Sequence, residues 1–348
     1  MKLNKKLNGV FIATTLTLAT GAANAGYTVK TGDDESITFG GYLAADVKHI
    51  DGDLAPLFND FFIGNAAVQD GTSMTKFSVA SSRLNTKYVS GDTMAFVELD
   101  FYTGEGNEVL TNSIGPRLRH AFIKHGNWTV GQTWSTYIDT GALAEAVDFG
   151  GPLVASGFVR QTQIRYTNGN FQFAIENPES YGGDSTQDAM PDVIGKYTTK
   201  GDWGHVSVSA VFKSLNTAGG SSETALGYGV TGKVKVGEKD DVRFQYHGGN
   251  VGRYVGAAAA TDLSGEEVET STSVMVSYRH VWNNEYRSSV FYGNHQTDET
   301  DRDRSHWGVN LFRSVTKKLT AGFEVGNYEA AEVNKDSTYI QFQLKYGL

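Results

Sequence analysis

Apolar and polar side chains alternate along most of this chain with a period of two residues. The pattern is clearest at residues 37–47 and 95–101, and it recurs at 206–212, 274–278 and 340–346. A period of two places successive side chains on opposite faces of an extended backbone, whereas a helix repeats every 3.6 residues. The pattern therefore predicts many β-strands, each with one apolar face and one polar face.

The connections between these strands are alternately short and long. The short ones carry Gly, Asn and Asp, which tight hairpin turns favour. This order predicts about sixteen strands of about ten residues, with turns at one end of the sheet and loops at the other. The short connections are 90–92, 126–127, 168–170, 200–202, 237–241, 282–285 and 316–318, and the long ones are 50–75, 103–115, 136–158, 178–192, 215–224, 251–268, 296–304 and 330–337.

Strands of this kind are typical of a transmembrane antiparallel β-barrel. In lipid every backbone N–H and C=O group must pair within the protein, so a sheet spans a membrane only when it closes on itself. A soluble exported β-sandwich or propeller also alternates, but the strict order of short and long connections favours the barrel. The sequence therefore predicts an all-β protein in the outer membrane of a Gram-negative bacterium, in contact with lipid and lipopolysaccharide.

The first 25 residues have the pattern of an export signal. Lys2, Lys5 and Lys6 precede an uncharged, largely apolar run at 7–20, and Ala23-Asn24-Ala25 fits the small-residue cleavage rule. We expect a signal peptide at 1–25 and a single barrel domain at 26–348. The chain contains no Cys, so the sheet has to hold together without disulfides.

The connection at 136–158 is too long for a hairpin turn and too rich in small residues for a core helix. Loops of this length inside a compact domain are usually functional. We expect it to fold into the lumen and to narrow the pore. The candidate constriction residues are Asp139, Glu145, Asp148 and Phe149.

The polar faces of the strands predict a basic lumen, although the whole chain has a formal charge of -9. At the alternate strand positions that are predicted to face the lumen, basic residues outnumber acidic ones. Most of the acidic side chains are therefore expected in the loops. A low-dielectric wall concentrates such a field and attracts anions. An alternative is that these side chains are ordinary lumen charges paired with one another. The candidate pore-lining and substrate-binding residues are Arg83, Lys87, Arg117, Arg119, Arg165, Lys196, Arg243 and Arg287.

Several short motifs lie in and around the long connection. They are Arg117-Leu118-Arg119-His120-Ala121, Gly131-Gln132-Thr133-Trp134-Ser135, Asp148-Phe149, Gly151-Pro152, Arg160-Gln161 and Arg165-Tyr166-Thr167. With these motifs the chain resembles the DcaP-like family of trimeric outer-membrane porins. The resemblance implies a sixteen-stranded homotrimer in which a loop between strands 5 and 6 constricts the pore. It also implies passage of small anionic solutes such as dicarboxylates.

Catalytic and cofactor motifs are not found in the sequence. The eight His form no HExxH pair, no Ser lies in a GxSxG elbow, and no glycine loop is placed to cradle a phosphate. The acidic stretch 298–303 resembles a Ca²⁺ loop only weakly, because Arg302 and Arg304 interrupt it. An acidic chain without a basic patch is also a poor nucleic-acid binder. We therefore expect a passive channel for small anions that is not an enzyme and has no cofactor; the alternatives are a plugged structural or adhesive barrel and an outer-membrane hydrolase.

Overall fold

The computed structural model describes residues 26–55, 67–102 and 111–348. The predicted signal peptide lies outside the described residues. Within them the chain forms β-strands and four short 3-10 helices, and no helix there is long and apolar enough to cross a membrane. The strands of the wall are β2 (Glu35–Ala55), β3 (Ala67–Ser78), β4 (Arg83–Ser90), β5 (Thr93–Asp100), β6 (Arg117–His125), β7 (Trp128–Trp134), β8 (Arg160–Asn168), β9 (Phe171–Glu176), β10 (Asp192–Gly201), β11 (Gly204–Asn216), β12 (Ser222–Val236), β13 (Asp240–Gly249), β16 (Ser271–Val281), β17 (Tyr286–Thr297), β18 (Asp303–Ser314), β19 (Leu319–Ala330) and β20 (Lys335–Gly347).

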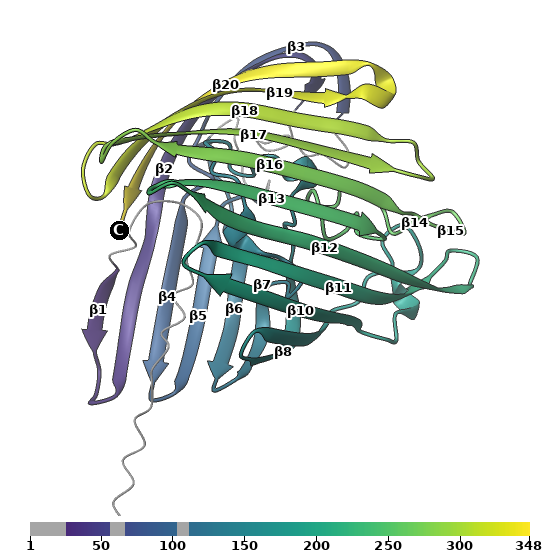
Figure 1. The fold of residues 1–348 in the computed structure, drawn as a ribbon, viewed down its shortest axis with the longest axis horizontal. Coiled ribbons are helices and arrows are strands. Elements are labelled where there is room, and N and C mark those ends of the chain that lie inside the picture. Colours follow the sequence, from purple (N-terminus) through teal and green to yellow (C-terminus); the bar gives the residue numbers. More distant parts are fainter. Residues whose placement is uncertain (1–25, 56–66, 103–110) are drawn as a thin grey trace, which may run out of the picture.

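The wall strands pair antiparallel in chain order, except that β3 and β4 both pair with β2, and the sheet closes where β20 pairs with β2 (Figure 1). The closing register runs from Tyr42 opposite Gly347 to Gly52 opposite Ser337. On its other edge β2 pairs with β3 and then with β4, which together form one interrupted strand of the wall. The predicted closed barrel of sixteen antiparallel strands is confirmed.

The interruption between β3 and β4 is bridged by a side chain. Ser82 Oγ accepts a hydrogen bond from Ala44 N at 2.9 Å and donates one to Ala44 O at 3.2 Å. These two bonds satisfy the backbone of β2 on the edge where neither β3 nor β4 reaches it. Such satisfaction is required because an unpaired backbone group in a membrane wall is costly.

The two faces of the wall have the predicted composition. Outward side chains such as Val208, Val309 and Ile340 are exposed, whereas the inward Asn310 and Gln341 next to them are buried. Inward polar residues are buried because other parts of the chain fill the lumen. The turns at one end of the wall use glycine where φ is positive, as at Gly91 and Gly126 with φ of 56° and 53°.

Strand lengths differ from the sequence prediction on the long-loop side. The connection predicted at 50–75 contains the end of β2 and most of β3, and that predicted at 215–224 shrinks to five residues between β11 and β12. Beyond the apolar band both faces of a strand meet water, so the alternation disappears while the hydrogen bonding continues. The N-terminal strand β1 (Tyr27–Lys30), which pairs with β2, was also not predicted.

Candidate functional site in the lumen

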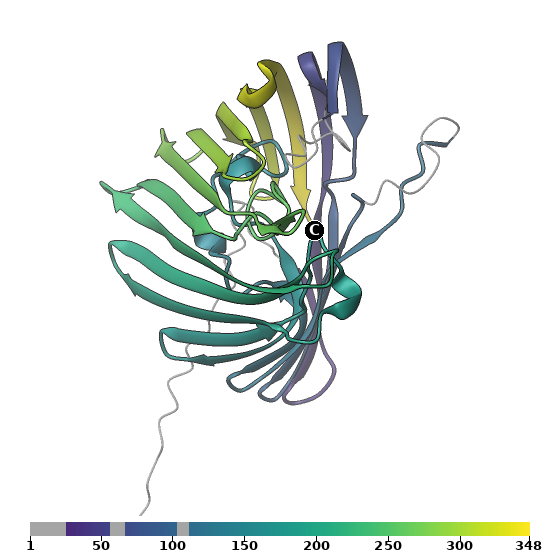
Figure 2. The same cartoon turned by 90° about the vertical axis from the view of Figure 1, so that its right-hand side faces the viewer.

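The connection between β7 and β8 lies inside the barrel. We call residues 135–159 the inserted loop; it contains the 3-10 helices η1 (Thr140–Ala142) and η2 (Leu153–Ala155) (Figure 2). Ser135 N donates to Val159 O at 3.0 Å, which closes the loop at its base. Tyr137 is fully buried, and its hydroxyl donates to Tyr228 O on β12 at 2.7 Å. The loop therefore reaches strands far from its own in the sequence.

The first part of the inserted loop is fastened to β10–β13. Asp139 lies 2.9 Å from His205 Nε2 on β11 and accepts a hydrogen bond from Thr231 Oγ1 on β12 at 2.9 Å. Lys196 Nζ donates to Ile138 O at 2.6 Å, and Arg243 Nη1 donates to Leu143 O at 2.6 Å. Three of the predicted site residues, Asp139, Lys196 and Arg243, thus hold the loop to the wall.

The middle of the inserted loop is fastened to β17, β19 and β2. Glu145 pairs with Arg287 at 2.8 Å, and Asp148 pairs with Lys48 at 2.6 Å. The buried carboxylate of Glu324 accepts hydrogen bonds from two loop N–H groups, Val147 N at 2.7 Å and Asp148 N at 3.1 Å. These contacts satisfy loop backbone that would otherwise be buried without a partner.

Through Phe149 the inserted loop contacts side chains of β4 and β6. Its ring centroid lies 4.5 Å from that of Tyr102, and the guanidinium groups of Arg83 and Arg119 lie 5.3 Å and 5.5 Å from its centroid. Cations over an aromatic face are attracted to its negative quadrupole. The predicted residues Phe149, Arg83 and Arg119 are therefore brought together at one place in the lumen.

The arginines on β6 are neutralised by neighbours on β5. Arg117 holds Asp100 through two bonds, Nε to Oδ1 at 2.8 Å and Nη2 to Oδ2 at 2.7 Å. Arg119 has no exposed surface and donates to Glu98 at 2.9 Å and to Asp100 at 2.7 Å. Two arginines thus face two carboxylates, and this ladder adds no net charge to the lumen.

The last two predicted cations differ from each other. Arg165 is half-buried and donates to Trp134 O at 2.6 Å and to Gln163 Oε1 at 2.9 Å, so it braces the start of the inserted loop. Lys87 is exposed near the short-turn end of β4, away from the loop contacts given above. Of the predicted lumen cations, most are bound to carboxylates or to loop carbonyl groups rather than left free in an open lumen.

A second segment also folds inward, between β13 and β16. Phe158 N donates to Tyr254 O at 3.1 Å, and Gly256 N donates to Ser156 O at 2.8 Å. Arg253 on this segment donates to Asp192 at 2.8 Å and to Gln161 at 2.8 Å. We call residues 250–262 the second inward segment. It packs on the returning part of the inserted loop, although the sequence predicted only a polar loop at 251–268.

Between the two inward segments and the wall lies a cavity of about 340 Å³. It is lined by three guanidinium-bearing side chains, Arg117, Arg160 and Arg253, and by the rings of Tyr102, Phe149 and Phe158, and none of its described lining residues is acidic. The Arg160 guanidinium lies 4.9 Å from the Trp134 ring centroid and 5.7 Å from that of Phe158. Its Nη1 is buried and has no hydrogen-bond partner.

Comparison with known proteins gives the family. The model of the DcaP outer membrane protein family matches residues 63–337, which is most of the chain. The chain belongs to the DcaP outer membrane protein family. This confirms the family resemblance, the outer-membrane location and the porin class that were predicted from the sequence. Among curated proteins, none matches the sequence.

Solved porins share the fold of this DcaP-family chain. The outer membrane channel DcaP of Acinetobacter baumannii aligns with a TM-score of 0.77 at 18% identity, covering 92% of this chain and 99% of that one. An anion-selective porin from Comamonas acidovorans gives 0.58 at 12% identity, covering 90% and 100%. The trimer form of OmpT from Vibrio cholerae gives 0.53 at 14% identity, covering 91% and 100%. At these identities the likeness shows the barrel fold alone.

Two residues of this DcaP-family cavity were missed as site residues. Arg160 appeared in the sequence only within a family motif, and Arg253 lay in a loop expected outside the lumen. Two signals pointed to them: Arg160 opens a strand directly after the inserted loop, and Arg253 precedes a run of small and apolar residues, Tyr254-Val255-Gly256-Ala257, that is unusual for a solvated loop.

The acidic stretch 298–303 is held by hydrogen bonds to residues outside it. The carboxylate of Glu269 accepts bonds from the N–H groups of Asp298 at 3.1 Å and Glu299 at 2.9 Å. Asp303 accepts bonds from Asn294 and Gln296. Within residues 26–55, 67–102 and 111–348, no group of three or more His, Asp or Glu is arranged to hold a metal ion.

Proposed function

We propose that this DcaP-family porin is a passive diffusion channel for small hydrophilic solutes, with a preference for anions such as dicarboxylates. The observation that carries the proposal is the cavity beside the inserted loop, lined by Arg117, Arg160 and Arg253 without a described acidic side chain. A cation in a confined, low-dielectric space raises the local concentration of anions and repels cations. Two structural relatives, one an outer membrane channel and the other an anion-selective porin, agree with this direction.

The inserted loop provides the constriction in this proposal. It is anchored to strands on several sides of the barrel, so it stays within the lumen and limits the size of solutes. No chemical step is needed, because solutes follow their own gradients. The sign of the solute is then selected by Arg160, which lines the cavity beside the loop and has no ion pair to a described residue.

Single-channel recording in planar bilayers tests the proposal. We expect discrete conductance steps. In a KCl gradient we expect a reversal potential closer to the equilibrium potential of chloride than to that of potassium. Absence of steps would favour a plugged structural barrel. A reversal potential closer to the equilibrium potential of potassium would contradict the anion preference. Activity of the purified protein toward esters or peptides that disappears with one Ser or His would favour a hydrolase.

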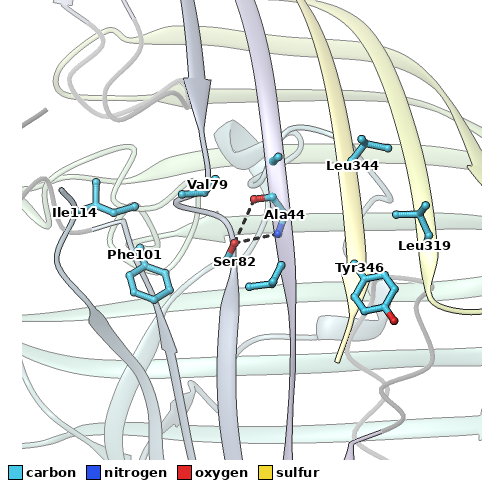
Figure 3. Close-up of a pocket in the computed structure, with 10 residues that line it drawn as sticks. Ala44, Val79, Ser82, Phe101, Ile114, Leu319, Leu344 and Tyr346 are labelled. Atoms are coloured by element: carbon cyan, nitrogen blue, oxygen red, sulfur yellow. Dashed lines mark hydrogen bonds between the residues drawn. The ribbon is translucent and has the colours of Figure 1, made fainter. Parts of the chain in front are cut away.

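We further propose that the protein is a homotrimer that uses the outward face of β20, β2 and the break between β3 and β4. A groove of about 530 Å³ lies there, lined almost wholly by apolar side chains (Figure 3). Its floor includes Ala44 and Ala45, and beside it Phe77 projects with 78% of its surface exposed. A small-residue groove next to a protruding ring suits packing by a second copy of the chain, and one solved relative is described as a trimer.

The trimer contact is tested by filling the groove. We expect Ala45→Trp to convert trimers to monomers in native mass spectrometry of detergent-extracted protein, because the indole occupies the space of the neighbouring copy. Val276→Trp on the outward face of β16 is the matched control and should leave the trimer intact. Equal trimer fractions in the two variants would place the contact elsewhere.

A further inference from the structure

The charges around the lumen cavity do not cancel. Arg117 and Arg119 face Asp100 and Glu98, and Arg253 faces Asp192. Arg160 has no hydrogen bond or ion pair to any described residue; Arg119, Arg117 and Arg83 repel it, and Asp100, which Arg117 and Arg119 already hold, attracts it less strongly. A confined guanidinium group without a carboxylate of its own is costly. Among the three arginines that line the cavity, Arg160 is therefore the one without an acidic partner.

The Arg160 side chain is also held in place. Its guanidinium lies against the rings of Trp134 and Phe158, which restrict its rotation through cation–π contact. A guanidinium group offers two parallel N–H donors that match the two oxygens of a carboxylate. Because the guanidinium makes no hydrogen bond to a described residue, an incoming carboxylate gains hydrogen bonds from the N–H groups that face the cavity without displacing existing ones.

The remaining lining is mostly apolar. Beside the arginines the cavity presents Tyr102, Phe149, Phe158 and the methyl groups of Ala257 and Ala258. Its volume of about 340 Å³ is at the small end of the range for ligand sites. It offers a surface for a short hydrocarbon or ring, but no second unmatched cation for a second carboxylate.

We propose that this cavity binds small monocarboxylates with an apolar body, with the carboxylate on Arg160 and the body against Phe149 and Phe158. The inference rests on the proposed function, because solutes reach the cavity through the lumen. The two proposals concern different steps: small anions, dicarboxylates included, pass through the lumen, and only monoanions of this shape are retained in the cavity. A dicarboxylate of equal length leaves one carboxylate against rings and methyl groups, where it loses water without gaining a partner.

Calorimetric titration of the full chain in detergent with sodium hexanoate, adipate and acetate tests the site. Hexanoate and adipate share a six-carbon chain and differ by one carboxylate, and acetate lacks the apolar body. We expect hexanoate to bind one per chain and about tenfold more tightly than either of the others. Adipate binding as tightly as hexanoate would overturn the proposal.

Variants of Arg160 assign the binding to the cavity. We expect Arg160→Gln to weaken hexanoate binding about tenfold. Arg160→Lys keeps the charge but loses the two parallel N–H donors, and we expect it to weaken binding about threefold. Lys317→Gln, in the exposed turn between β18 and β19, is the matched control and should bind as the unaltered protein does. Unchanged hexanoate affinity in both Arg160 variants, with folding verified by heat-modifiable gel mobility, would overturn the assignment.

Conductance separates this inference from the proposed function. If the protein conducts and prefers chloride while hexanoate does not bind, the retention site is wrong and the channel stands. If hexanoate binding depends on Arg160 but no conductance steps occur, the site stands and the channel proposal is wrong.

Discussion

The two halves of the inserted loop handle charge in opposite ways. Its outgoing half, residues 135–148, places Glu145 and Asp148 against cations of the wall and Asp139 against His205, each within 3 Å of its partner. Its returning half, residues 149–159, is held by aromatic contacts and backbone hydrogen bonds. Next to it, Arg160 has no acidic partner among the described residues. Paired charges hold a loop in position, whereas an unpaired charge is available to a solute. The two halves of one loop therefore distinguish cations that hold the structure from a cation that is available to bind a solute.

The largest effect is expected on the outgoing half. Glu324→Ala removes the acceptor for the N–H groups of Val147 and Asp148, which are buried in the lumen. Each orphaned donor costs about 1–3 kcal/mol, so we expect the docked loop to lose about 2 kcal/mol or more. Urea-unfolding midpoints and open-channel noise measure the change. Unaltered noise and stability would mean that the outgoing half is held by other contacts.

The next effect is expected at the unpaired cation. Arg160→Glu reverses a charge that lines the cavity and has neither an ion pair nor a hydrogen bond to a described residue, so the chloride-to-potassium permeability ratio should fall about tenfold. The matched control is Arg313→Glu, which makes the same change at a side chain that is 53% exposed at the short-turn end. Reversal potentials in a KCl gradient compare the two. Equal shifts in both variants would show that selectivity follows total charge and not this site.

A smaller effect is expected when the pH is lowered. Burial alone would raise the pKa of Asp139, but the hydrogen bond from His205 and the nearby Lys196 ammonium lower the pKa to about 2. Because the unfolded value is 3.8, this docking contact is fully present above about pH 4 and is lost as pH falls toward 2, at a cost of about 2 kcal/mol. Loop mobility, followed as channel noise, should rise in that window. Asp139→Asn should remove the pH dependence; if it persists, another carboxylate is responsible.

The smallest effect is expected at Lys87. This predicted pore residue is exposed near the short-turn end, where water and salt screen its charge. We expect Lys87→Gln to change the permeability ratio by less than about twofold. A shift approaching that of Arg160→Glu would move the selective region from the cavity toward the turns.

Local sequence pattern was sufficient for the wall but not for the lumen. The alternation at 206–212 and 340–346 determines which side chains face lipid, because that rule acts within one strand. The partners inside the lumen are set by closure of the ring: Lys48 meets Asp148, and Glu145 meets Arg287, across 100 and 142 residues of sequence. A single sequence without structure offers no rule that pairs residues at such separations.

The location of the inserted loop was predicted, and its detailed role was not. Its length and small residues indicated a lumen position, and contacts such as that of Tyr137 with β12 agree with it. The second inward segment was missed because Arg253 and the polar residues around it resemble a solvated loop. Arg160 was missed because a motif match does not reveal that a guanidinium has no acidic neighbour.

The loop anchors also have a consequence for assembly. Glu324 on β19 and Lys48 on β2 belong to strands at opposite ends of the chain, which become neighbours through β20 only when the cylinder closes. The outgoing half of the loop cannot settle against both before that moment. A nascent barrel therefore has a wall before the outgoing half of the loop has both of its anchors, and these contacts form together when the cylinder closes.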